Sequence, residues 1–142
     1  MRMLDADILS YSLLENHVAS PYVKPLIEKG LVGEIELYVT HTVLLEAYNT
    51  LYWYYRVRPR SKVASKIELV ARGLNLIPPS SGGFTIAVEE NVPLGDALLL
   101  ATALENRIPI IVSNDKHIEK LCRKYGLIFE NPIPQNIRSQ MS

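Results

Sequence analysis

Four carboxylates stand in stretches of the sequence that are otherwise apolar. Asp96 stands near the head of the stretch PLGDALLLATALEN (93–106), and Glu46 has apolar neighbours at 43–45 and 47–48. Asp5 and Asp115 each follow a short apolar run. Taken singly, each acid has a structural explanation as a turn residue, a surface residue or a first-turn residue favoured by the helix dipole. Because burying an unpaired carboxylate is costly, however, the four are candidates for shared chemistry.

The chemistry that suits four converging carboxylates is the binding of a hard divalent cation. Four anions in one place repel one another unless they are protonated or neutralised. No Lys or Arg lies within three residues of Asp5, Glu46 or Asp96 except Arg2. Oxygen ligands of this kind are typical of Mg²⁺ or Mn²⁺ sites, and such sites usually act on phosphate.

The elements that would position these acids alternate between strand and helix. The apolar start (RMLDADIL) predicts a strand that ends near Asp5, and Asp115 opens a helix after the apolar run IPIIVS. Glu46 falls in the first or second turn of a helix capped by Thr40 or Thr42, and Asp96 in the first turn of its own helix. The expected strands are 2–5, 35–40, 75–78, 108–113 and 127–132, and the expected helices are 19–34, 41–58, 60–74, 84–91, 93–107 and 114–126.

This alternation predicts an α/β fold with a mostly parallel sheet covered by helices on both faces. In an open sheet of this kind, ligands bind outside the carboxyl ends of the strands. All four acids are predicted to lie at or near that edge. The sequence therefore predicts that they meet.

The composition of the chain argues against several other classes of protein. The chain has 142 residues, with 15 Lys plus Arg and 15 Asp plus Glu, so it does not resemble a protein that holds nucleic acid by bulk charge. One cysteine, Cys122, allows no internal disulfide and, without a Cys/His cluster, argues against a zinc site. No apolar run approaches the roughly 20 residues of a membrane span. We expect one cytoplasmic domain at 1–131 and a loosely ordered tail at 132–142.

At these acids the sequence resembles the PIN-domain family of nucleases. The matching stretches are MLDADIL (3–9), TVLLEAYNTL (42–51) and PLGDALLLATALENRIPIIVSNDKHIEKL (93–121). The last is the most specific, because it joins a buried helix with a leading Asp, an apolar strand and a Ser-x-Asp turn. The family's acidic quartet falls on Asp5, Glu46, Asp96 and Asp115, and its hydroxyl position falls on Ser113.

The resemblance implies a three-layer α/β/α fold with a central sheet of four to five mostly parallel strands. It also implies Mg²⁺- or Mn²⁺-dependent cleavage of RNA, frequent homodimers and, for a stand-alone chain of this length, a VapC-like toxin with a small VapB-like antitoxin partner. Asp7 departs from the family pattern, in which Asn or Ser is frequent at that position. We expect Asp7 to cap the following helix, with an added role in metal binding as the alternative.

Other side chains are candidates for contacts outside the acidic site. The stretch YYRVRPRSK (54–62) combines tyrosines with Arg56, Arg58, Arg60 and Lys62, which suits RNA backbone and stacked bases, although a solvated helix end explains it equally well. Tyr48, Leu51, Tyr52 and Tyr55 follow helical spacing and predict a core stripe. Trp53 lies off that stripe and is the better interface candidate.

Three other functions stay open at this point. A Mg²⁺-dependent phosphatase of another α/β fold would share the first acid, but LDADIL has no phosphate-cradling glycine loop. A PIN-like RNA-binding module without activity would be expected to have lost an acid, and all four are present. A housekeeping RNA-processing nuclease would differ from a toxin in having no antitoxin gene beside its own.

Overall fold

The computed structural model describes residues 1–141, and its centre is a five-stranded, all-parallel sheet. Across the sheet the strands run in the order β3 (Asn75–Ile77), β2 (Leu37–Thr40), β1 (Arg2–Leu4), β4 (Ile110–Val112) and β5 (Ile128–Glu130). Strands β2 and β3 lie on one side of β1, and the chain then crosses back to place β4 and β5 on the other side. The point of reversal lies between β1 and β4, which is where such sheets bind ligands.

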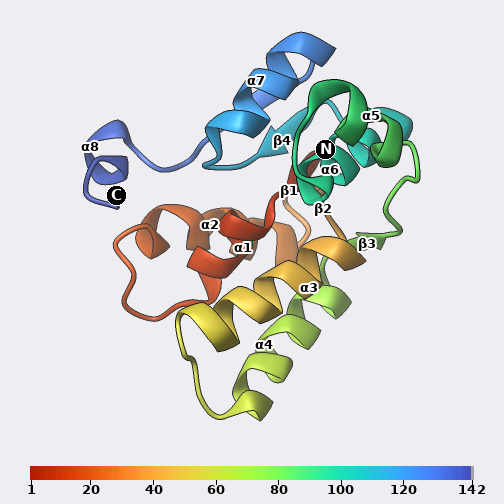
Figure 1. The fold of residues 1–142 in the computed structure, drawn as a ribbon. Helices are drawn as coiled ribbons and strands as arrows, with labels where there is room; N and C mark the ends of the chain where they lie inside the picture. Colours follow the sequence, from red (N-terminus) through yellow and green to blue (C-terminus); the bar gives the residue numbers. More distant parts are fainter. Residues whose placement is uncertain (142) are drawn as a thin grey trace.

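Helices cover both faces of this sheet (Figure 1). One layer holds α1–α4 and the other holds α5–α7, as right-handed crossovers on either side of a reversal require. This confirms the predicted three-layer α/β/α architecture. The helices are α1 (Ala6–Leu13), α2 (Ser20–Leu31), α3 (His41–Asn49), the π-helical turn η1 (Thr50–Tyr54), α4 (Arg60–Gly73), α5 (Gly83–Glu90), α6 (Leu94–Glu105), α7 (Lys116–Tyr125) and α8 (Gln135–Arg138).

The N-terminal segment differs from the prediction. The sequence predicted one strand and no helix before residue 19, but β1 ends at Leu4 and α1 follows at once. Asp5 ends the strand because its side chain caps the new helix, accepting a hydrogen bond from the Ala6 N–H at 2.7 Å. Ile8 and Leu9 are fully buried, so their apolar character reflects a core-facing helix rather than a longer strand.

The predicted long helix 41–58 is also divided. Thr40, one of the two predicted caps, accepts a hydrogen bond from the Val43 N–H at 3.1 Å and begins α3. The helix then widens into η1 and ends at Tyr55. Leu51 is fully buried there in a small second core, against which Tyr48, Tyr52 and Tyr55 pack as the helical stripe predicted.

The C-terminal segment also differs from the prediction of a loose tail. Within residues 132–141, Ile133 is buried in the main core, its N–H donates to Asn131 Oδ1 at 3.1 Å, and α8 follows. The buried Ile133, with Ile137 and Met141 packed against the same core, therefore holds this segment against the domain. Ser142, the last residue of the predicted tail, lies outside the described residues.

The main core lies between the sheet and the helical layers. Helix α6 is its most buried helix: Ala97, Leu99, Leu100 and Ala103 are all at most 2% exposed. Cys122 is buried, with a free thiol. Within residues 1–141, no helix is long and apolar enough to cross a membrane.

Candidate active site

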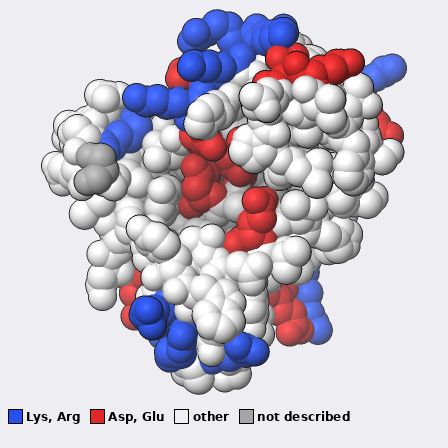
Figure 2. All heavy atoms as spheres, viewed as in Figure 1, with Lys and Arg blue, Asp and Glu red and all other residues white. Residues whose placement is uncertain are grey.

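The four predicted acids line one cavity at the carboxyl edge of the sheet. The cavity has a volume of about 230 Å³ and contains a fifth acid, Asp7. Its acidic lining residues come from the ends of β1 and β4, the first turns of α1 and α6 and the second turn of α3. These residues are Asp5, Asp7, Glu46, Asp96 and Asp115, joined by Ala6, Ser10, Tyr11, Thr50 and Tyr55. Figure 2 shows acidic side chains gathered in a hollow in the middle of the molecule's face.

No Lys or Arg is among the described residues that line this cavity, so no protein cation lowers the pKa values of its carboxyl groups from within the lining. Burial, reinforced by Asp5 and Asp96, raises the pKa of Glu46 to about 7. Burial, reinforced by Asp115 and Asp5, raises the pKa of Asp96 to about 6. Because the carboxylates destabilise one another in the charged form, the cavity favours either protons or a bound cation.

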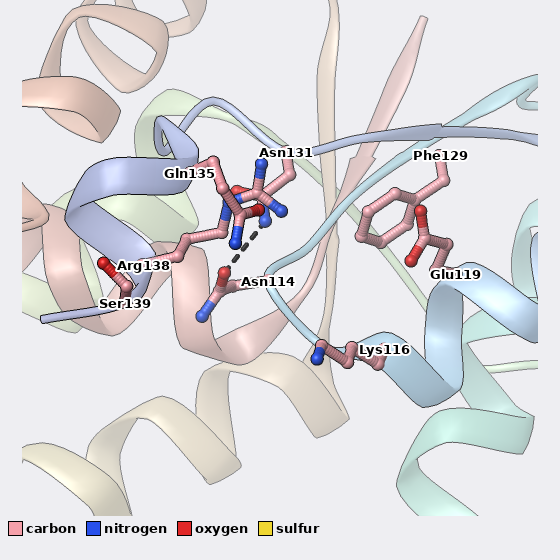
Figure 3. A pocket seen from close by; sticks show the side chains of 8 residues that line it. All are labelled: Asn114, Lys116, Glu119, Phe129, Asn131, Gln135, Arg138 and Ser139. Carbon is pink, nitrogen blue, oxygen red and sulfur yellow. Dashed lines mark hydrogen bonds between the residues drawn. The ribbon is translucent and has the colours of Figure 1, made fainter. Parts of the chain in front are cut away.

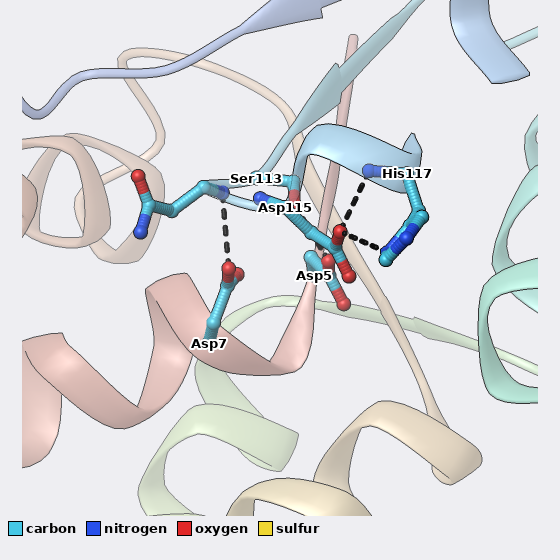
Figure 4. Close-up of polar contacts among 6 residues, drawn as sticks. Asp5, Asp7, Ser113, Asp115 and His117 are labelled. Atoms are coloured by element: carbon cyan, nitrogen blue, oxygen red, sulfur yellow. Dashed lines mark hydrogen bonds and ion pairs between the residues drawn. The ribbon is translucent and has the colours of Figure 1, made fainter. Parts of the chain in front are cut away.

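A hydrogen-bonded chain joins the ends of β1 and β4 (Figure 4). The Ser113 hydroxyl donates to Asp5 Oδ2 at 2.6 Å, and its oxygen accepts from the Asp115 N–H at 3.0 Å. Ser113 is fully buried, so these bonds have no competition from water. Burial raises the pKa of Asp5, while the bond from Ser113 opposes that rise. Ser113 therefore positions two of the four predicted acids at once.

Asp7 does not have the expected role of helix cap, because Asp5 takes that place. Its Oδ1 accepts from the Ile8 N–H at 2.7 Å, and its Oδ2 accepts from the Asn114 N–H at 3.0 Å. Burial, reinforced by Asp5, raises the pKa of Asp7 well above its usual value. Asp7 thus ties α1 to the turn after β4 and adds a fifth carboxylate to the cavity. Its position two residues after the first strand was the only sequence signal for this role.

Asp115 and His117 lie at the start of α7. Asp115 caps this helix by accepting from the His117 N–H at 2.7 Å, and its Oδ1 also lies 3.2 Å from His117 Nδ1. One potential ligand atom from each of Asp96, Asp115 and His117 lies within 4.8 Å of the others. His117 is exposed, as expected for a helix surface residue, but the sequence did not predict that its ring would face the acids.

The carboxylate of Glu46 packs directly against Gly95 at the cavity. A Cβ atom placed on Gly95 would lie 2.7 Å from Glu46 Oε2, closer than side chains tolerate. The residue before Asp96 therefore has to be small for the Glu46 carboxylate to occupy its place beside Asp96. This close approach connects α3 to α6 at the site.

Replacing Gly95 with alanine should displace the Glu46 carboxylate and leave the fold intact, because Glu46 can rotate away. We expect divalent-metal affinity to fall about tenfold, within the range for groups that support metal ligands. Isothermal titration calorimetry with Mn²⁺ measures this. The matched control is Gly82→Ala, where the new Cβ would meet only ordinary contacts of 3.4 Å or more. Equal affinities for the two variants would contradict the assigned position of Glu46.

Replacing Ser113 with alanine removes the hydroxyl that connects Asp5 to Asp115. We expect a loss of about 1–3 kcal/mol in unfolding free energy, because the Asp115 N–H loses its acceptor. We also expect Mn²⁺ affinity to fall roughly 10- to 100-fold. Ser12→Ala is the matched control, since Ser12 is also buried but donates only to Leu9 O in its own helix. If both variants bind Mn²⁺ equally well, Ser113 has no special part in the site.

Most of the predicted RNA-contacting residues have partners within the protein. None of Arg56, Arg58, Arg60 and Lys62 lines the acidic cavity. The Arg58 guanidinium stacks 3.8 Å from the Tyr52 ring centroid and donates to the Tyr52 carbonyl at 2.6 Å. Arg60 lies 4.3 Å from the same ring, and Lys62 pairs with Glu15 at 2.9 Å. Three of the four thus have intramolecular partners, Tyr52 in η1 for Arg58 and Arg60 and Glu15 after α1 for Lys62.

The donor set of the cavity fits a hard divalent cation. Carboxylate oxygens from Asp5, Glu46, Asp96 and Asp115 converge with no protein cation among the cavity's lining residues. Oxygen-rich, anionic sites of this kind suit Mg²⁺ or Mn²⁺. Burial and mutual repulsion raise the pKa values of Asp5, Glu46 and Asp96, and a bound cation would relieve both effects.

Comparison with known proteins supports the fold. The structure resembles VapC20 of Mycobacterium tuberculosis, described as a sarcin–ricin loop cleaving toxin, with a TM-score of 0.66 and 14% identity over 85% of this chain and 95% of that one. It also resembles VapBC2 of Rickettsia felis, solved with a DNA fragment from its promoter, with a TM-score of 0.65 and 19% identity over 92% and 97% of the two chains. A search of curated protein sequences finds no significant match.

The sequence itself matches the PIN domain over residues 2–124. That stretch runs from the first strand to the last turn of α7 and contains all five acids of the cavity. It covers most of the 142 residues. The predicted resemblance is thereby confirmed, and the chain belongs to the PIN-domain family.

Proposed function

We propose that this protein is a metal-dependent endoribonuclease and the toxin of a VapBC-type toxin–antitoxin pair. The observation that carries the proposal is the cavity in which five carboxylates meet without a protein cation among the described lining residues. Its place at the reversal point of a parallel sheet is where α/β folds bind ligands. Membership of the PIN-domain family and the likeness to VapC folds support the same assignment.

In this proposal Asp5, Glu46, Asp96 and Asp115 hold Mg²⁺ or Mn²⁺, and His117 lies close enough to Asp96 and Asp115 to add a nitrogen ligand. The bound ion supplies a lowered pKa for an attacking water and charge stabilisation for the phosphate. Ser113 fixes the positions of Asp5 and Asp115 relative to each other through its two hydrogen bonds. Glu46 and Asp115, which line the same cavity, are the candidates to orient the attacking water or accept its proton.

The proposed partners follow from the fold and from exposed apolar side chains. RNA is the proposed substrate, and one similar structure is described as a sarcin–ricin loop cleaving toxin. A VapB-like antitoxin is the proposed partner, and the second similar structure is a VapBC complex. Trp53 and Tyr54 at the end of the Glu46 helix, and Phe84 and Val88 on α5, are more than half exposed. Apolar groups of this kind suit antitoxin or homodimer contacts in the cytoplasm.

The experiment that tests the proposal compares two phosphate substrates. A mixed RNA pool and a small phosphate monoester are each incubated with the protein, with Mg²⁺, with Mn²⁺ and with a chelator. We expect cleavage of RNA only with metal and no release of phosphate from the monoester. Hydrolysis of the monoester alone would favour a phosphatase, and RNA binding without cleavage would favour a silent binding module. An antitoxin reading frame beside the gene separates the toxin from a housekeeping nuclease.

A further inference from the structure

A second cavity lies next to the acidic one, between the first turns of α7, strand β5 and helix α8. It has a volume of about 350 Å³, and we name it the α8 cavity. Figure 3 shows it with its lining side chains. These are Asn114, Lys116, Glu119, Phe129, Asn131, Gln135, Arg138 and Ser139. The chemistry proposed above uses none of them.

The α8 cavity contains two cations without a carboxylate partner. Within the described residues, neither Lys116 nor Arg138 forms an ion pair. The Nε of Arg138 is buried and has no hydrogen-bond acceptor in the described structure. A cationic side chain that lines a cavity and has no anionic partner is a candidate to bind an anionic ligand there. The guanidinium group is the side chain best matched to phosphate oxygens.

The remaining lining groups suit a nucleobase. Figure 3 places Phe129 and Glu119 on one side of the cavity and Arg138, Gln135 and Asn131 on the other. An aromatic ring offers a stacking surface for a base, while amide and carboxylate groups bind its polar edge. Glu119 lies on the Phe129 side, away from Arg138, so its charge does not oppose a phosphate bound to the arginine.

The geometry joins this cavity directly to the acids. The Asn114 side chain lines the α8 cavity and accepts from Asn131 Nδ2 at 2.8 Å, while the Asn114 backbone N–H donates to Asp7 Oδ2 in the acidic cavity. Asp115 belongs to the acidic cavity, and the next residue, Lys116, belongs to the α8 cavity. A strand with one phosphate at the acids therefore has its neighbouring nucleotide within reach of Arg138.

We propose that the α8 cavity binds one nucleotide of the RNA substrate next to the cleaved bond, with Arg138 and Lys116 on its phosphate and Phe129 against its base. This inference rests on the proposed function for the identity of the ligand. It also explains why a chain without net charge can hold RNA, because the cations that matter are placed at one end of the acidic cavity. It further gives α8 and the segment anchored by Ile133 a role in substrate binding.

The test measures RNA affinity by fluorescence anisotropy, with a labelled single-stranded RNA of about ten mixed nucleotides. The protein carries Asp96→Asn, so that the RNA is not cut, and the salt concentration is varied. Arg138→Gln should weaken binding about tenfold. It should also reduce the slope of log affinity against log salt by about 0.7, the value for one phosphate contact to a single strand. Lys116→Gln, at an exposed position, should reduce the slope similarly.

The control is Arg123→Gln, an exposed arginine on α7 outside the lining of this cavity, which should leave affinity and slope unchanged. Thermal unfolding of each variant shows whether the fold is intact. In the cleaving protein, Arg138→Gln should raise KM and change kcat little. If Arg138→Gln and Lys116→Gln both match the control, the α8 cavity does not bind RNA. A parent protein that binds RNA through Arg138 but never cleaves it would overturn the proposed function and leave the α8 cavity as an RNA-binding site only.

Discussion

Replacing Asp96 with asparagine should lower metal-dependent RNA cleavage at least about 100-fold, which corresponds to about 2.7 kcal/mol of activation free energy. Asp96 is the acid whose ligand atom lies near those of both Asp115 and His117, and its charge is coupled to Asp5. The amide has the same shape but no negative charge, so it is a poor ligand for a hard cation. The fold should be intact, because α6 is held by its buried apolar residues.

A control on the same helix separates this effect from a general change of charge. Glu105→Gln makes the same chemical change at the exposed end of α6, far from the cavity lining. It should cleave RNA like the parent. Steady-state cleavage of a labelled RNA with Mn²⁺, together with thermal unfolding, measures both variants. Parental activity in Asp96→Asn would remove this carboxylate from the site.

Without metal, the protein should become less stable as the pH rises from about 4 to about 7. The pKa values of Glu46 and Asp96 are raised in the folded state to about 7 and about 6, from ordinary values of 4.5 and 3.8. In that pH window the folded state binds more protons than the unfolded state, so the stabilising protonated form is lost as pH rises. At pH 8 the cavity contains several repelling carboxylates.

Divalent metal should reverse this loss at pH 8. A cation at about 100 times its dissociation constant adds about 2.7 kcal/mol, or on the order of 10 °C in Tm. Glu46→Gln should raise the Tm of the metal-free protein at pH 8 and reduce the response to metal, because one repelling charge is gone. Differential scanning calorimetry at pH 5 and pH 8, with chelator and with Mn²⁺, measures these shifts. A metal-free protein that gains stability between pH 5 and pH 8 would contradict the assigned pKa directions.

Much of the site could be predicted because parallel strands bring their carboxyl ends to one edge. Asp5 and Asp115 follow β1 and β4, which are neighbours in the sheet, so locating the strands was enough to bring these acids together. Glu46 and Asp96 could be predicted because each lies in the early turns of a helix that begins at that edge. The apolar residues around them showed that these turns face inward.

Other parts depend on contacts that no local pattern records. Asp7 and Asp5 are equivalent as possible caps in the sequence, and only the position of the Asn114 N–H gives Asp7 its bridging role. The ring of His117 faces Asp115 because the cap turns the first residues of α7 toward the cavity. The order of residues 132–141 follows from the buried Ile133 and from Ile137 and Met141, which pack against the same core in a stretch otherwise made mainly of prolines and polar residues.

The α8 cavity illustrates the same limit. Its residues come from β5, α8 and the start of α7, and no spacing in the sequence connects Asn114 with Arg138. The predicted basic stretch at 54–62 was more conspicuous, but Arg58 and Arg60 stack on Tyr52 and Lys62 pairs with Glu15. Cations with internal partners are weaker candidates for RNA contacts than the unpaired Arg138.

Titration of the metal-free protein with Mn²⁺ by isothermal calorimetry at pH 7.5 tests the central claim most directly. We expect saturable binding to the parent, release of protons that grows as the pH is lowered toward 6, and binding at least tenfold weaker in Asp96→Asn. Glu105→Gln should bind like the parent. The account is contradicted if the parent binds no Mn²⁺, or if Asp96→Asn binds it with parental affinity.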